Sequence, residues 1–409
     1  AAACTKKAFL VMSADDLAPT LHEAFHIAQE GRPGPVLVDV PRDVQLEVTE
    51  YILEEPLPAP DLSLSPETLD RIKQAARLIN EAERPLIIAG HGIVSSGATQ
   101  ELKALAEITG IPVITTLLGL SGFPGDHPLN LGMLGMHGMY WSNIAVDQAD
   151  LLVGLAMRFD DRVTGKASTF APHARIIHLD IEASQVGRNV PVEVPLVGDA
   201  KTILKELLPQ VKPVDRPAWM DNIGQLRQDH PSLDIPASEN LMPQQVLTNL
   251  NQLLQEEPDS VVVTGVGQHQ MWAAQFLFFN SVNTFVSSGG QGAMGFELPA
   301  AMGVQAGKPG TPVWTVAGDG GFQMTLQELA TVANENLPVK IALFNNGNLG
   351  MIRQWQEMYF ENHFKAVPIP GPDYVGLAKA YGVEAMQVTE LEDVLPALRR
   401  ARAHDGPFL

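Results

Sequence analysis

Residues 313–356 decide the fold of this chain; they read VWTVAGDGGFQMTLQELATVANENLPVKIALFNNGNLGMIRQWQ. Residues 313–317 and 339–344 are short apolar runs typical of buried strands, and the spacing of apolar residues over 325–334 predicts a helix between them. A strand–helix–strand unit of this kind places two parallel strands in one sheet. The sequence therefore predicts an α/β fold in which both strand ends open at the same edge of the sheet.

Polar turns follow both of these strands. GDGG, residues 318–321, comes after the first strand and NNGN, residues 345–348, after the second, so Asp319 and Asn346 can meet although they are 27 residues apart. Carboxylate and amide oxygens are ligands that Mg²⁺ accepts together with phosphate and water, and glycines let backbone N–H groups approach a phosphate. Asp-Gly and Asn-Gly are also ordinary turn signals. Their pairing at two strand ends favours a metal–phosphate site over two plain turns.

Composition limits the class of protein. With 409 residues, of which 45% are hydrophobic, the chain is long enough for two or three domains with buried cores. A formal charge of −20 disfavours a nucleic-acid or anionic-membrane partner but not a small anionic substrate. The single cysteine, Cys4, suggests a reducing compartment, and no apolar run reaches the ~20 residues of a membrane span. We expect no signal peptide and a cytoplasmic or mature organellar enzyme.

The first part of the chain predicts a strand at residues 7–12, a helix at 15–29 and a buried strand at 35–40. One such fragment is too small to form a domain alone. We therefore expect residues 1–55 to be the C-terminal part of a domain, and the proline-rich residues 56–65 to be a linker.

The helix at residues 15–29 contains HEAFH, residues 22–26, which fits the zinc-protease pattern HExxH. A zinc site needs a third ligand, usually from a following helix, and here a strand follows instead. We therefore favour a position near the surface for His22 and His26, with Phe25 and Ile27 on the apolar face of the helix.

Residues 66–211 predict a doubly wound parallel sheet, because strands and helices alternate. Gly90, Gly92, Asp180 and Asp199 stand at strand ends, where a nucleotide could bind. The full GxGxxG fingerprint is missing, so plain turn roles remain open. Strands are expected at 86–89, 112–117, 151–155, 176–181 and 192–197, and helices at 69–79, 100–109 and 201–208.

A polar connector with several prolines is expected at residues 212–239, followed by a third domain at 240–409. Its first helix and strand are predicted at 244–255 and 261–264, and they lead into GVGQHQMW at 265–272. A Gly-x-Gly before a helix suits a phosphate at the helix N-terminus. In the purely structural interpretation, Met271 and Trp272 belong to the core and His269 is a hydrogen-bonded histidine with no ligand.

Five further motifs together resemble the large catalytic subunits of acetolactate synthase (acetohydroxyacid synthase), a family of thiamine-diphosphate enzymes. They are GVGQHQMWAAQ (265–275), GAMGF (292–296), LGMLGMHG (131–138), MRFDDRVTGK (157–166) and GMIRQWQ (350–356). The GDG and NN pair is shared by the wider superfamily. The resemblance implies three doubly wound parallel-sheet domains: a pyrimidine-binding domain ending near residue 55, a central FAD-binding domain and a diphosphate-binding domain.

The resemblance assigns roles around thiamine diphosphate to the matching residues. Asp319, Asn346 and the backbone carbonyl of Asn348 would hold Mg²⁺ on the diphosphate. Met294 would support the bent cofactor, although a core methionine is the alternative. The diphosphate edge of the site would be lined by Gln268, His269, Gln270, Gly318 and Gly320.

The same resemblance implies an FAD site and a substrate site. Arg162 matches the arginine that meets the carboxylate of the second substrate, a task that suits a guanidinium fork. Trp355 matches the tryptophan that favours 2-ketobutyrate, with Met351 one helical turn before it; the alternative is an apolar i, i+4 pair. The family's FAD contacts match Arg32, Gly90, Gly92, Met136, His137, Arg158, Asp180 and Asp199.

The implied activity is carboligation, the first common step of branched-chain amino-acid biosynthesis. Pyruvate is decarboxylated on thiamine diphosphate, and the hydroxyethyl unit is joined to pyruvate or 2-ketobutyrate. FAD takes no redox part in this reaction. The family also implies a homodimer or tetramer with a separate small regulatory subunit, in the bacterial cytoplasm or in a plastid or mitochondrion.

Several positions depart from the family pattern. The motif of the glutamate that faces the cofactor's pyrimidine ring is not supplied, nor is the lid segment after Leu409, so we expect a portion of a longer protein or a chain that is inactive as it stands. Glu297 and Gln291 stand where a small residue and a leucine are usual. The alternatives are a related 2-keto acid decarboxylase or oxidase, which the MLGMHG and RQWQ motifs disfavour, and a non-catalytic FAD-binding fragment.

Overall fold

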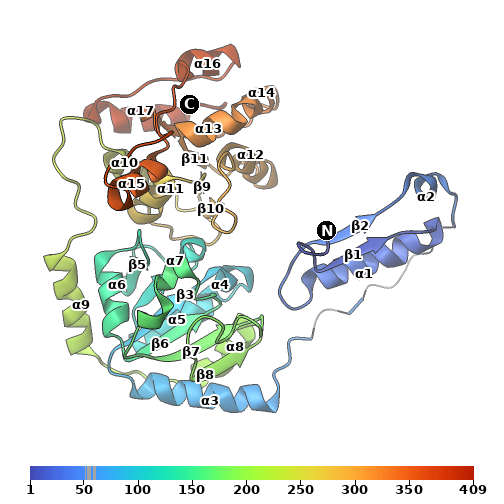
Figure 1. The fold of residues 1–409 in the computed structure, drawn as a ribbon, viewed down its shortest axis with the longest axis vertical. Helices are drawn as coiled ribbons and strands as arrows, with labels where there is room; N and C mark the ends of the chain where they lie inside the picture. Colours follow the sequence, from blue (N-terminus) through green and yellow to red (C-terminus); the bar gives the residue numbers. More distant parts are fainter. Residues whose placement is uncertain (51, 53–56, 59–60) are drawn as a thin grey trace.

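The computed structural model describes residues 1–50, 52, 57–58 and 61–409, so the expected linker at 56–65 lies partly outside the described residues. Its strands form three sheets, of two, six and four strands, and every pair of neighbouring strands is parallel (Figure 1). The predicted α/β class is confirmed. Across the described part of the chain, no helix combines the length and the apolar character needed to cross a membrane.

The N-terminal sheet consists of β1 (Lys7–Leu10) and β2 (Val36–Asp39), which α1 (Leu17–Gln29) connects. The order is as predicted, but the second strand alternates between half-buried and exposed residues instead of being buried. The expected apolar face of α1 is also wrong, because Phe25 is 68% exposed and Ala24 is the buried residue of the helix. The other short elements here are η1 (Ala14–Asp16) and α2 (Arg42–Leu46).

The six-stranded sheet has the order β5-β4-β3-β6-β7-β8. The chain begins in the middle, moves outward to one edge, and then crosses to fill the other half. This reversal creates a topological switch point between β3 and β6. The strands are β3 (Pro85–Ala89), β4 (Val113–Thr115), β5 (Asn130–Met133), β6 (Leu151–Leu155), β7 (Arg175–Asp180) and β8 (Val194–Val197).

Helices cover both faces of this sheet, so it has two cores. Ile87 packs into the core that includes α3, α5 and α8, whereas its neighbours Leu86 and Ile88 pack into the core on the opposite face. Burial on both faces explains why β3 and β6 read as unbroken apolar runs. The elements are α3 (Pro66–Glu81), α4 (His91–Ser95), α5 (Thr99–Thr109), η2 (Leu117–Gly119), α6 (Tyr140–Gln148), α7 (Asp161–Thr164), η3 (Ala167–Thr169), α8 (Ala200–Leu207) and η4 (Leu208–Gln210).

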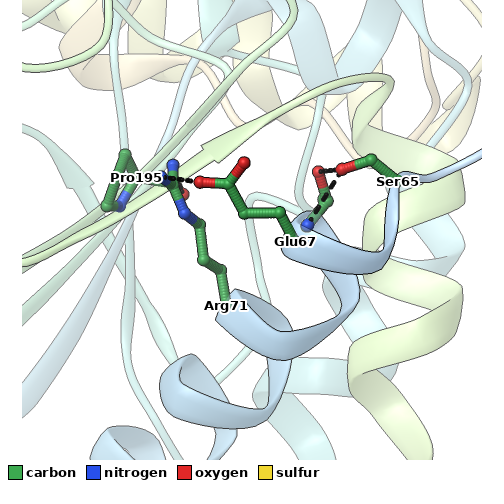
Figure 2. Close-up of polar contacts among 5 residues, drawn as sticks. Ser65, Glu67, Arg71 and Pro195 are labelled. Atoms are coloured by element: carbon green, nitrogen blue, oxygen red, sulfur yellow. Dashed lines mark hydrogen bonds and ion pairs between the residues drawn. The ribbon is translucent and has the colours of Figure 1, made fainter.

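The start of α3 is fixed by its own sequence. Ser65 Oγ accepts a hydrogen bond from the Thr68 N–H at 3.1 Å, and proline occupies the first helical position (Figure 2). Such a cap satisfies a free backbone donor, and proline suits the first turn. Arg71, which pairs with Glu67, also donates to the Pro195 carbonyl of β8 at 3.3 Å. The helix that opens this part of the chain is thereby held to the far edge of the sheet.

The expected connector at residues 212–239 contains more structure than its polar composition predicts. Helix α9 (Pro217–Asp229) buries Trp219, whose indole N–H donates to the Pro85 carbonyl at 3.1 Å. Before it, the buried Arg216 donates to the carbonyls of Ile79 and Ala82, each at 2.8 Å. The connector is therefore bonded to the six-stranded sheet and its helices.

The C-terminal sheet has the order β10-β9-β11-β12, which places a second switch point between β9 and β11. Val313 and Ala317 of β11 pack in one core with α12 and α14, whereas Trp314 packs on the other face with α10 and α17. The elements are α10 (Pro243–Glu256), β9 (Val261–Thr264), α11 (Gln268–Phe276), β10 (Phe285–Ser287), α12 (Glu297–Gly307), β11 (Val313–Gly318), α13 (Asp319–Thr325), η5 (Leu326–Glu328), α14 (Leu329–Asn334), β12 (Lys340–Phe344), α15 (Gly350–Tyr359), α16 (Tyr374–Ala380) and α17 (Leu391–Ala403).

The helix predicted at residues 325–334 is wrong in its start. Helix α13 begins at Asp319, directly after β11, and the 3-10 turn η5 separates it from α14. Two consecutive glycines conceal this start, because glycine has a low helix propensity. Tertiary packing overrides that preference, since Phe322 is fully buried in the core. As a result, Asp319 opens a helix instead of lying in a loop.

Candidate functional site

Three strands of the C-terminal sheet end at one edge of it. Gln268 opens α11 soon after β9, Asp319 opens α13 after β11, and the turn of residues 345–348 follows β12. The boundary between β9 and β11 is the switch point, and open α/β sheets bind ligands in the crevice at such points. The topology therefore gathers the predicted diphosphate and metal residues at one place.

Asp319 contacts the turn after β12, as the two strand ends predict. Its Oδ2 accepts a hydrogen bond from the Gly347 N–H at 2.6 Å, and its Oδ1 accepts one from the Gly320 N–H at 2.8 Å. The residue as a whole is buried, at 3% exposure. Burial raises the pKa of Asp319, while the backbone N–H groups of the turn oppose that rise.

The asparagines of this turn bond to each other. The Asn348 N–H donates to Asn346 Oδ1 at 3.0 Å, and the Asn348 side chain donates to the Asn346 carbonyl at 2.7 Å. Within the described ranges, no group of three or more His, Cys, Asp or Glu side chains could hold a metal ion, at this turn or at the HEAFH helix. One carboxylate with amide and carbonyl oxygens suits Mg²⁺, which completes its shell with phosphate and water. The donor set therefore fits a Mg²⁺ ion carried by a diphosphate.

A cavity of about 250 Å³ lies beside the turn. Gln268 Nε2 donates to Gln354 Oε1 at 3.0 Å, so the GQHQMW and GMIRQWQ motifs are in contact. Sequence reasoning missed the residues that α15 contributes, since the pattern of a helix does not tell which polar side faces a cavity. The lining residues are Gln268, Asn346, Asn348, Gly350, Arg353, Gln354 and Glu357.

His269 is buried, and its ring lies against Gly267 of its own turn and Gly318 at the end of β11. A Cβ built on Gly318 would lie 2.7 Å from His269 Nδ1, so only glycine fits there. The Nε2 atom of His269 is buried without a hydrogen-bond partner among the described residues. Gln270 is engaged differently, because its Nε2 donates to Ser287 Oγ of β10 at 2.7 Å. Of the two, His269 is the one that keeps a buried polar atom for a ligand.

Met294 lies beside the GDGG turn. A Cβ built on Gly320 would lie 3.4 Å from Met294 Cε and 2.8 Å from Leu349 Cδ2. Met294 itself is half-buried. This position is compatible with both interpretations that the sequence left open, the cofactor contact and core packing.

Gly90 and Gly92 follow β3 at the switch point of the six-stranded sheet. The loop after β6 comes so close that a Cβ on Gly90 would lie 2.3 Å from the Ala156 carbonyl oxygen, and one on Gly92 would lie 2.5 Å from Ala156 Cβ. Backbone packing alone therefore requires both glycines. Arg158 follows in the same loop and forms an ion pair with Asp160 at 3.0 Å.

Asp180 ends β7 and Asp199 follows the neighbouring strand β8, but the two differ in their contacts. Burial raises the pKa of Asp180, and the Glu182 N–H and the charges of His178 and Arg32 oppose that rise. Asp199 instead caps α8, since its Oδ1 accepts from the Thr202 N–H at 2.9 Å. Its position at a strand end concealed this structural role.

The loop after β5 carries Met136, which is 49% exposed, and His137. Burial, and to a lesser degree the charge of Arg162, lowers the pKa of His137. The Arg162 side chain is 76% exposed on the short helix α7. Gln275 of α11 donates to the His137 carbonyl at 2.7 Å. Since α11 begins with the diphosphate residues, this bond connects the two halves of the predicted site.

Met351 and Trp355 lie one turn apart on α15, and both are half-buried. The Trp355 ring packs at 5.1 Å, between ring centroids, from Tyr359. No residue of α15 is fully buried. The helix is therefore accessible along its surface, and both interpretations of Met351 and Trp355, substrate contact and apolar pair, stay predictions.

A larger cavity, of about 510 Å³, contains none of the predicted site residues. It lies between the loop before β5 and the end of α11, and its lining is mainly apolar, with Arg227 at the wall. Arg227 already donates to the Asn130 carbonyl at 2.6 Å and lies over the Trp141 ring. This cavity is separate from the edge that gathers the polar groups.

His269 should make the cofactor-free protein sensitive to acid. Burial lowers its pKa from 6.5 to about 4. Because this is below the value in the unfolded chain, the unfolded state gains a proton first as the pH falls below 6.5, and stability is lost down to about pH 4. The loss at the low end is about 3 kcal/mol. We expect His269→Gln to flatten the fall in unfolding free energy between pH 7 and pH 4.5, measured by urea denaturation.

The matched control is His363→Gln, because His363 is exposed. This variant should lose stability with falling pH as the wild type does. Equal slopes for His269→Gln and the wild type would contradict the burial of an unpaired neutral imidazole.

Comparison with known proteins agrees with this geometry. Two thiamine pyrophosphate enzyme models match, the central domain over residues 72–207 and the C-terminal TPP binding domain over residues 265–409. The chain is 45% identical to the acetolactate synthase large subunit of Corynebacterium glutamicum, over 99% of this chain and 66% of that protein. It is 43% identical to the acetolactate synthase of Mycobacterium bovis, over 99% and 68%.

A third relative is the probable acetolactate synthase large subunit of Methanocaldococcus jannaschii, at 41% identity over 99% of this chain and 71% of the relative. The chain thus spans roughly two thirds of the length of the proteins it matches. The percentage identity is similar for the bacterial and archaeal relatives, and the matched region includes the sheets and turns described above. The chain therefore belongs to the acetolactate synthase large-subunit family of thiamine pyrophosphate enzymes.

Proposed function

We propose that this chain is the catalytic subunit of an acetolactate synthase. It decarboxylates pyruvate and joins the two-carbon unit to pyruvate or 2-ketobutyrate, in the first common step of branched-chain amino-acid biosynthesis. The observation that carries the proposal is the contact of Asp319 with the turn of residues 345–348, next to Gln268 at a switch point of a parallel sheet. The family membership of the chain supports the same reaction.

In this proposal the C-terminal sheet holds thiamine diphosphate and Mg²⁺. Asp319, Asn346 and the carbonyl of Asn348 ligate the metal, and Gln268 and His269 receive the diphosphate together with the N–H groups that follow Gly318 and Gly320. Met294 supports the cofactor from the adjacent loop. When bound, thiamine diphosphate supplies the electron sink for breaking and forming a bond at a carbonyl carbon. The protein's part is to hold the cofactor, exclude water and orient the two keto acids.

The six-stranded sheet would hold FAD at its own carboxyl edge. The residues proposed for this are Arg32, Gly90, Gly92, Met136, His137, Arg158, Asp180 and Asp199. The exposed Arg162 would bind the carboxylate of the second substrate through two parallel hydrogen bonds. Burial and, less strongly, the charge of Arg162 lower the pKa of His137, which supports a position of the substrate arginine near the flavin residues. Trp355 and Met351 would contact the side chain of the second keto acid.

We further propose the domain limits 1–55, 66–211 and 240–409, and an assembly of at least two copies with a small regulatory subunit. Bacterial relatives, and relatives from Zea mays named as chloroplastic, make the cytoplasm or a plastid the proposed location.

The test is an assay of the purified protein with pyruvate, thiamine diphosphate, Mg²⁺ and FAD. We expect acetolactate, and acetohydroxybutyrate when 2-ketobutyrate is added, and a bound flavin visible by its absorbance. Release of CO₂ without either product would instead indicate a decarboxylase. Bound flavin with no turnover would indicate a non-catalytic FAD-binding fragment.

A further inference from the structure

Glu297 is a buried acid that the proposed mechanism does not use. It is the first residue of α12, which begins after the GAMGF motif, and it is 0% exposed. Neither of its carboxyl oxygens has a well-aligned hydrogen-bond partner among the described residues, although the N–H groups of Gly295 and of Glu297 itself lie near the carboxyl group. Leaving a buried polar group unpaired costs about 1–3 kcal/mol of stability. A role in stabilising the fold alone therefore does not explain why an acid is buried here.

The carboxyl group lies between two glycine turns of the diphosphate site. A Cβ built on Gly265 would lie 2.0 Å from Glu297 Oε2, and one built on Gly321 would lie 2.6 Å from Oε1. Gly265 directly follows β9, just before Gln268 and His269, whereas Gly321 lies in the first turn of α13, the helix that begins with Asp319. One side chain therefore touches the backbone of both turns that the cofactor's diphosphate must fit between.

The charge state of this group favours such a place. Burial raises the pKa of Glu297, and the N–H groups of Gly295 and of Glu297 itself oppose that rise only in part. A raised pKa reduces the charge that this group sets against a diphosphate, and its protonated form carries an O–H that can donate. The space it fills is the space that any side chain at residue 321 would need.

We propose that Glu297 is a positioning residue of the diphosphate site, where its carboxyl group fixes the separation between the turn after β9 and the turn at the start of α13. This inference rests on the proposed cofactor site. Removing the side chain lets the two turns shift, and the loss of an outer partner of a metal site typically costs about 10- to 100-fold in affinity. The role depends on the size and shape of the group, so glutamine should replace it and alanine should not.

The experiment measures binding of thiamine diphosphate with Mg²⁺ by calorimetry, together with the unfolding temperature of the cofactor-free protein. We expect Glu297→Ala to bind about 10- to 100-fold more weakly than the wild type, and Glu297→Gln to bind within about threefold of it. The cofactor-free unfolding temperature of Glu297→Ala should stay within about 3 °C of the wild type. The matched control is Gln305→Ala at the other end of α12, which is also buried and should leave the affinity unchanged.

A double-mutant cycle makes the contact itself testable. Gly321→Ala alone should weaken binding, because its Cβ would meet Glu297 Oε1. In the Glu297→Ala, Gly321→Ala double variant the new methyl group has room, so the loss should be smaller than the sum of the two single losses. Additive losses would overturn the proposal.

The remaining outcomes separate the two proposals. If the wild type binds the cofactor and Glu297→Ala binds it equally well, only the role of Glu297 is wrong. Loss of binding in Glu297→Gln as large as in Glu297→Ala would also overturn it. If the wild type binds no thiamine diphosphate, the proposed function fails, and the role of Glu297 fails with it.

Discussion

Replacing Asp319 with alanine is expected to weaken Mg²⁺-dependent binding of thiamine diphosphate about 100-fold or more. Even outer-shell partners of metal ligands are worth about 10- to 100-fold in affinity, and Asp319 would be the charged ligand itself. The substitution also removes the acceptor of the Gly347 and Gly320 N–H groups, so the turn after β12 loses its tie to α13. Calorimetric titration of the cofactor in the presence of Mg²⁺ measures the effect.

The control for this variant is Asp373→Ala. Asp373 accepts from the Gly376 N–H at 3.0 Å and caps α16, so its loss affects a helix start and removes none of the hydrogen bonds that Asp319 accepts. It should lower stability slightly and leave cofactor affinity unchanged. Wild-type affinity in a folded Asp319→Ala protein would refute the metal assignment.

Replacing Trp355 with leucine is expected to remove the preference for 2-ketobutyrate over pyruvate as the second substrate. A contact of this kind discriminates by about 1–3 kcal/mol, or roughly 10- to 200-fold in the ratio of products. Acetolactate should still form, because the diphosphate and metal residues lie on other elements. The measurement is the ratio of acetohydroxybutyrate to acetolactate when both keto acids compete.

Tyr359→Leu is the matched control, since Tyr359 is the exposed aromatic that packs on Trp355 one turn further along α15. It should leave the product ratio near that of the wild type. An unchanged ratio in Trp355→Leu would sink the specificity role, and an equal change in both variants would point to a general disturbance of α15.

The sequence predicts the parts of the site that depend on strand ends. Asp319 and Asn346 each follow an apolar run, and parallel strands open at one edge, so their meeting follows from topology alone. The central strands are equally visible, because a parallel sheet covered on both faces leaves unbroken apolar runs such as β3 and β6.

Contacts between distant segments could not be predicted in this way. The bond from Gln275 to the His137 carbonyl, and the position of Glu297 between two glycine turns, join residues that share no local pattern. Asp199 stays a predicted ligand contact because it follows a strand, and the structure adds a helix cap that the strand end did not indicate. Strand β10 has only three residues, too few for a period to appear.

The central claim is that the edge formed by β9, β11 and β12 holds thiamine diphosphate through Mg²⁺. The most direct measurement is a calorimetric titration of thiamine diphosphate into the purified wild-type protein, once with Mg²⁺ and once with excess EDTA. We predict saturable binding at one site per chain with Mg²⁺, and no measurable binding in EDTA. Equal binding under both conditions, or no binding with Mg²⁺, would contradict the account.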